Sequence, residues 1–148
     1  EEGSVERKDP RDRLDLRIAQ PDVMGLTPYA IDETRMAVFS KEYEARYGQP
    51  PTRNPAYEDD WYIARAPNGN LTTFIKCENT AFRGDGVRLQ GDQVISEQGQ
   101  AAAGCFHYFS DVENKLSISL NYKRAFLADW KRMEDAVRDV LARSRVRK

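Results

Sequence analysis

The sequence has little of the residues that build metal centres and many catalytic sites. It contains one histidine, His107, and two cysteines, Cys77 and Cys105, among 148 residues. No Cys-x-x-Cys pair occurs, so a zinc site is not expected. The chain also lacks Gly-x-Ser-x-Gly, Gly-x-x-x-x-Gly-Lys and His-Glu-x-x-His, which are typical of hydrolases, phosphate-binding loops and zinc proteases. We therefore predict neither a metal nor a cofactor.

Charge and hydrophobicity set further limits. The formal net charge is −1, whereas nucleic-acid-binding surfaces need an excess of basic residues. No run of 18 apolar residues occurs, so no segment is expected to cross a membrane as a helix. The length suits one domain. We expect a disordered polar lead at residues 1–13 and a single α+β domain over residues 14–148.

The pattern of apolar residues predicts two helices. Residues 32–47 carry an apolar stripe at helical spacing, with Asp32 as a candidate N-cap and Gly48 at the expected stop. Residues 123–143 carry a stronger stripe, and Asn121 is the candidate N-cap there. A helix with so large an apolar stripe must pack on another element.

The remaining pattern predicts strands. Period-two alternation or short apolar runs mark residues 14–18, 61–63, 71–77, 87–89, 94–95, 105–109 and 116–120. The Asn68-Gly69 turn joins two of these runs into a hairpin. The predicted fold class is therefore α+β, with an antiparallel sheet and a long C-terminal amphipathic helix packed on it.

The two cysteines each lie at or beside a predicted strand. Cys77 ends one apolar run and Cys105 begins another. If the two strands are neighbours, the cysteines can meet the Cα–Cα distance that a disulfide requires. We predict this disulfide, with two buried free thiols as the alternative. A disulfide indicates an oxidising compartment, such as a bacterial periplasm or the extracellular space.

The single histidine is flanked by aromatic residues in a predicted strand. If Phe106 and Tyr108 face the core, His107 faces the opposite, polar side. An enzyme hypothesis would pair His107 with Asp111 or Glu113 in a hydrolase. Because no motif nominates a nucleophile and an orienting acid around this histidine, we predict that the chain is not an enzyme.

An acidic run at residues 58–60 lies beside aromatic residues. Neighbouring side chains on an extended segment point to opposite faces, which is poor geometry for a glycosidase carboxylate pair. Aromatic anchors with steering charges are typical of protein interfaces, although a solvated turn is an alternative. We predict that Tyr57, Asp59, Asp60 and Trp61 form part of a partner-binding surface.

Four stretches together resemble a known family. They are Glu42-Tyr43-Glu44-Ala45-Arg46-Tyr47-Gly48-Gln49-Pro50, Phe74-Ile75-Lys76-Cys77-Glu78-Asn79, Cys105-Phe106-His107-Tyr108-Phe109, and Leu116 through Leu120 followed by Tyr122-Lys123-Arg124, Phe126-Leu127 and Asp129-Trp130. In order and spacing they resemble the periplasmic immunity proteins that neutralise lipase effectors of the bacterial type VI secretion system. The resemblance covers about residues 27–143.

The resemblance implies a stoichiometric inhibitor without catalytic residues. Such a protein would be periplasmic, in many cases anchored by a lipid at a removed N-terminus, and would bind a cognate phospholipase toxin. The family's cysteine pair falls on Cys77 and Cys105. An alternative is a secretion adaptor or chaperone that binds an effector without inhibiting it. Free thiols and a cytoplasmic location would favour this alternative.

Overall fold

The computed structural model describes residues 13–53, 58–79, 87–90, 93–96 and 103–146. Most of the polar lead expected at residues 1–13 lies outside this part of the chain, as does Tyr57. The elements are η2 (Leu14–Leu16), β1 (Arg17–Ala19), β2 (Thr27–Ile31), α2 (Glu33–Tyr47), β3 (Asp60–Arg65), β4 (Leu71–Cys77), β5 (Val87–Gln90), β6 (Gln93–Ser96), β7 (Gly104–Asp111), β8 (Leu116–Lys123), η4 (Arg124–Asp129) and α3 (Trp130–Val146).

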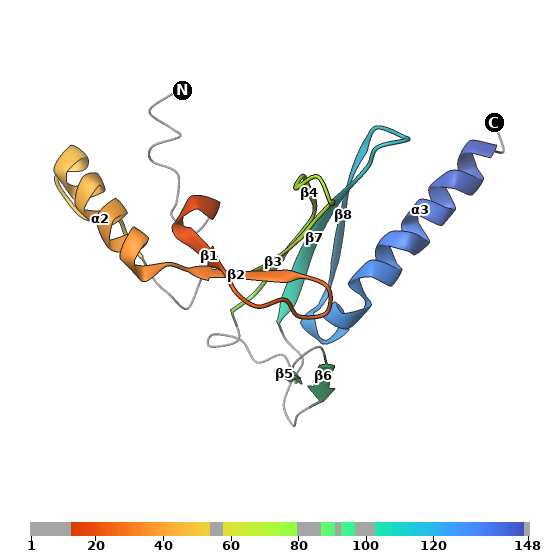
Figure 1. Ribbon diagram of the computed structural model, residues 1–148, viewed down its shortest axis with the longest axis horizontal. Helices are drawn as coiled ribbons and strands as arrows, with labels where there is room; N and C mark the ends of the chain where they lie inside the picture. The colour runs from red at the N-terminus through yellow and green to blue at the C-terminus, as the bar shows by residue number, and fades with distance from the viewer. Residues whose placement is uncertain (1–12, 54–57, 80–86, 91–92, 97–102, 147–148) are drawn as a thin grey trace.

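Six of the strands form one sheet in the order β1-β2-β3-β4-β7-β8, and every neighbouring pair is antiparallel. Strands β5 and β6 form a separate two-stranded hairpin. Figure 1 shows α2 and α3 at opposite ends of the molecule, with the sheet between them. The α+β fold class with a C-terminal helix against an antiparallel sheet is confirmed.

Helix α2 forms where the stripe predicted it. The Asp32 carboxylate accepts a hydrogen bond from the Thr34 backbone N–H at 3.0 Å, which satisfies a donor at the start of the helix. Gly48 ends the helix at φ 84°, a left-handed conformation that glycine adopts without steric cost. Met36 and Phe39 are buried against η2.

The C-terminal helix begins later than the sequence pattern predicted, and Asn121 is not its N-cap. Asn121 lies within β8, opposite Phe106, because the alternation of this strand continues to Lys123. The 3₁₀ helix η4 follows and places Leu127 in the core with no exposed surface. Only then does α3 begin, at Trp130.

The N-terminal strands also differ from the prediction. The segment predicted as one strand over residues 14–18 is divided between η2 and β1. Strand β2 was not predicted. It contains Pro28, and a proline argues against a central strand because it has no backbone N–H to donate to a neighbouring strand. In the structure Pro28 lies opposite Tyr62 of β3, and β2 joins β1 to the rest of the sheet.

One face of the sheet is covered by the C-terminal elements. Leu127 and Trp130 pack there with Tyr62, Ile75 and the buried cysteines in one core cluster. We call this side the helix face. Within the described residues, no helix is both long and apolar enough to cross a membrane.

Candidate functional site

In strand β7 the buried side and the exposed side are the reverse of those predicted. His107 has no exposed surface and lies on the helix face, whereas Phe106 and Tyr108 are 47% and 41% exposed on the other side. The expectation of a histidine on the polar face is therefore wrong. The strand exposes two large aromatic rings and buries its polar residue, the reverse of what solubility alone would favour.

The burial of His107 is explained by its hydrogen-bond partners. Its Nε2 lies 2.7 Å from Oε2 of Glu134, and its Nδ1 lies 2.9 Å from the Tyr122 hydroxyl. Thr73 donates its hydroxyl proton to the same Glu134 oxygen at 2.6 Å. Burial and the negative charge of Glu134 raise the pKa of Tyr122, so this phenol keeps its proton. The polar groups that the helix face buries are therefore paired with one another.

This buried network joins α3 to three strands. Glu134 comes from α3 and bonds to Thr73 of β4 and His107 of β7, and Tyr122 of β8 joins the network through His107. Arg138, one turn further along α3, lies 3.2 Å from Oε1 of Glu134 and stacks 5.0 Å over the Phe109 ring. The network positions α3 on the sheet and leaves the opposite face uncovered by this helix.

The same geometry removes the enzyme arrangement considered from the sequence. The nitrogens of His107 contact Glu134 and Tyr122, not Asp111 or Glu113. The Asp111 carboxylate instead accepts from the Asn114 side chain at 2.6 Å in the β7–β8 turn. Among the described residues, no group of three or more His, Cys, Asp or Glu side chains could hold a metal ion.

The side of the sheet opposite the helix face carries an aromatic row. Phe74 of β4 stacks on Tyr108 of β7 with a centroid distance of 6.3 Å. Trp61 of β3 is almost fully buried and meets Phe74 edge-on at 4.9 Å, so it supports the row from beneath. We call the part of this side formed by β4, β7 and β8 the open face. The open face includes Phe74, Phe106, Tyr108, Ser117 and Ser119.

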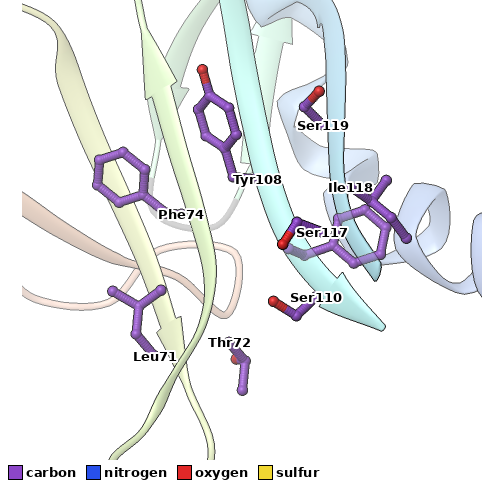
Figure 2. A pocket seen from close by; sticks show the side chains of 9 residues that line it. Leu71, Thr72, Phe74, Tyr108, Ser110, Ser117, Ile118 and Ser119 are labelled. Carbon is purple, nitrogen blue, oxygen red and sulfur yellow. The ribbon is translucent and has the colours of Figure 1, made fainter. Parts of the chain in front are cut away.

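The open face contains a pocket of about 440 Å³ (Figure 2). Phe74 and Tyr108 form its aromatic wall, and Leu71 extends that wall along β4. Ser117 and Ser119 of β8 line the opposite side. An apolar surface with a rim of small hydroxyl groups has the composition of a protein-binding patch, in which aromatic anchors are surrounded by polar contacts.

The residues of the acidic and aromatic cluster predicted from the sequence lie in different environments. The Asp60 carboxylate is paired with the buried guanidinium of Arg124, which also donates to the Tyr62 hydroxyl at 2.6 Å. Trp61 is 4% exposed and lies under the guanidinium of Arg17, 4.0 Å from its carbon to the ring centroid. Trp61 thus lies inside the fold, whereas the Asp60 side chain is 36% exposed and pairs with a buried cation.

Asp59 has a different environment. Burial raises the pKa of its carboxyl, while the positive charges of Lys76 and Arg17 oppose that shift. Lys76 lies between Phe74 and the end of β4, opposite Phe106, so Asp59 is placed near one end of the open face. The use of the cluster for partner binding stays a prediction. The sequence did not nominate the exposed Phe106 and Tyr108, although it showed that they share a side of the strand.

Cys77 and Cys105 form the predicted disulfide. They are directly opposite each other on β4 and β7, with a Cα–Cα distance of 4.1 Å, and both are buried on the helix face. The bond lies beneath the end of the open face and closes the segment that contains β5 and β6. The chain-entropy model gives such a loop a stabilisation of about 3.6 kcal/mol. The bond also links β4 directly to β7 across the sheet.

The comparisons with known proteins give one informative match. It is the structure of an immunity protein of the Stenotrophomonas maltophilia type IV secretion system, which is 70% identical in sequence with a TM-score of 0.79. The alignment covers 97% of this chain and 58% of that chain, so this chain spans somewhat over half the length of its neighbour. No family model and no curated protein matches the chain.

This match agrees with only part of the family resemblance seen in the sequence. The neighbour is an immunity protein, as the resemblance implied. Its secretion system is type IV, whereas the resemblance indicated type VI, and its description names no lipase. The immunity role and the particular toxin are therefore separate questions.

Proposed function

We propose that this chain is an immunity protein that binds a toxic effector of a bacterial secretion system and neutralises it. The observation that carries the proposal is the 70% identity to an immunity protein over 97% of the chain. Immunity proteins act by binding, which agrees with the prediction that the chain is not an enzyme. The buried and fully engaged His107 supports the same conclusion.

The open face is the surface that best fits the effector. Phe106 and Tyr108 are large rings that folding leaves nearly half exposed. Aromatic side chains of this kind are enriched among the residues that dominate binding energies. The pocket beside Tyr108 offers a cavity for an apolar group of the effector, with serine hydroxyls at its rim.

Two observations bear on the nature of the effector. The neighbour supports a type IV secretion effector, and the four sequence stretches support a lipase. We propose a type IV effector with lipase activity as the first candidate. Complex formation without any loss of effector activity would instead support the secretion adaptor considered from the sequence.

The disulfide supports a particular compartment. The bond between Cys77 and Cys105 is buried in the core, so its formation accompanies folding. Disulfides of this kind persist in the periplasm and are reduced in the bacterial cytoplasm. We propose a periplasmic location, in which the protein meets incoming effectors. The N-terminal lipid anchor remains a prediction from the family resemblance.

The test is protection of bacteria against the effector. Secreted toxins encoded by the organism that carries this chain would each be directed to the periplasm of a sensitive strain, with and without the chain exported to the same compartment. Restored growth, together with a purified complex of the two proteins, is the expected result. A periplasmic toxin of unrelated structure serves as the control that protection is specific. Absence of both protection and a complex would overturn the proposal.

A further inference from the structure

We propose that the outer edge of β8 accepts an extended segment of the effector as an additional antiparallel or parallel strand. This inference rests on the proposed function and deepens it, because it specifies the kind of structure that the effector presents. The effector would bind through its main chain to the edge and through alternate side chains to the open face. Such strand addition is a recurring mode of peptide recognition.

The hydrogen-bond pattern shows which groups of β8 face outward. The Arg124 N–H donates to the Ala103 carbonyl at 2.8 Å, so the backbone of residue 124 points toward β7. The register between β7 and β8 is continuous, and backbone direction alternates along an antiparallel strand. Four residues therefore direct both backbone groups away from the sheet. They are Ser117, Ser119, Asn121 and Lys123.

This edge lacks the usual obstacles to an added strand. Within the described sheet, β8 is the last strand and pairs with β7 alone. It contains no proline, and no bulge interrupts its eight-residue register with β7. Proteins commonly protect exposed edges with prolines, bulges or charged residues that point inward. Here the only charged residue within β8 is Lys123 at its end, and Lys115 lies in the turn that precedes the strand.

The two lysines near the ends of β8 indicate which kind of partner the edge can bind. Two copies of β8 that paired antiparallel around Ser119 would bring Lys115, in the turn just before each strand, close to Lys123 of the other copy. Like charges close together across paired strands are destabilising, and this register would create two such approaches. A foreign segment with carboxylates near both of its ends would meet both lysines favourably. The edge is thus better matched to an acidic segment of a partner than to a second copy.

The same strand links the edge to the pocket. The side chains of Ser117 and Ser119 lie on the open face and line the pocket next to Tyr108 (Figure 2). Directly opposed residues of paired strands have Cβ atoms about 4.5–5.5 Å apart. Alternate side chains of an added strand would therefore lie beside these serines, and a large apolar one would reach over the pocket. One extended segment can engage both features.

The first test removes one outward N–H. Ser119→Pro deletes a donor that points away from β7, and proline is tolerated on strand edges for this reason. Ser119→Ala is the matched control, because it changes the side chain and keeps the donor. With the purified effector identified by the protection test, we expect Ser119→Pro to weaken binding at least tenfold more than Ser119→Ala does. Both variants should melt within a few degrees of the original chain.

A second measurement stands even if Ser119→Pro fails to fold. In the unmodified chain, the amides of Ser117, Ser119 and Asn121 should exchange rapidly when free and become protected in the complex. A complex that forms and inhibits the effector while these amides stay unprotected would overturn this inference alone. No complex at all would overturn the proposed function with it. If these amides are protected in the absence of effector and the chain sediments as a dimer, a second copy occupies the edge. That result would also overturn the inference.

Discussion

Replacing Glu134 with alanine tests the physical basis of the open face. This carboxylate bonds to the His107 ring at 2.7 Å and to the Thr73 hydroxyl at 2.6 Å, and all three residues are buried. Its removal leaves two buried polar groups without their partner. Each such group costs about 1–3 kcal/mol when it stays buried without a partner. We expect Glu134→Ala to lower the free energy of unfolding by about 2–6 kcal/mol.

The assay is urea unfolding followed by circular dichroism, with two controls on the same helix. Glu134→Gln keeps an acceptor of similar shape, so it should lose less stability than the alanine variant. Asp135→Ala removes a neighbouring carboxylate whose side chain is 63% exposed, and it should change stability by no more than about 0.5 kcal/mol. A loss of less than about 1 kcal/mol for Glu134→Ala would refute the reasoning that this network attaches α3 to the sheet.

Three further predictions follow from local geometry. Replacing Cys77 and Cys105 together with alanine should cost about 2–4 kcal/mol in the free energy of unfolding, measured by urea titration. Gly48→Ala should lower the melting temperature, since the new side chain must adopt φ 84° at a helix end; a loss of about 1 kcal/mol is expected. Asp59 has a raised pKa, so the folded state favours the protonated form of its carboxyl. The free energy of unfolding therefore falls as the pH rises from 3.8, the ordinary pKa, through the raised pKa of the folded state. Asp59→Asn should flatten this part of the stability profile, and an unchanged profile would contradict it.

Local patterns carried enough information for much of the fold. The cap and stop of α2 were readable because Asp32 and Gly48 act within a few residues of themselves. The β3–β4 hairpin was readable from its Asn68-Gly69 turn, and the disulfide from two strand-bounded cysteines. Strand β2 was missed because Pro28 is tolerated only by virtue of its position in the assembled sheet.

The candidate surface could not be predicted by the same means. Alternation in β7 shows that Phe106 and Tyr108 share a side of the strand. A period of two does not show which of the two sides is buried. The choice depends on Glu134, which lies 27 residues away from His107 in the sequence. That carboxylate makes burial of the histidine favourable and leaves the aromatic rings outside. The relation is tertiary and leaves no local signal.

The most direct test of the account is a matched affinity measurement on exposed aromatic residues. Phe106 is 47% exposed on the open face, and Phe126 is 55% exposed in η4, outside it. Calorimetric titration of the effector into the double variant Phe106→Ser, Tyr108→Ser should show affinity weakened at least about a hundredfold, because each ring is expected to be worth about 2 kcal/mol or more. Phe126→Ser should bind as the original chain does. Equal affinity of the two variants, both correctly folded, would contradict the claim that the open face binds the effector.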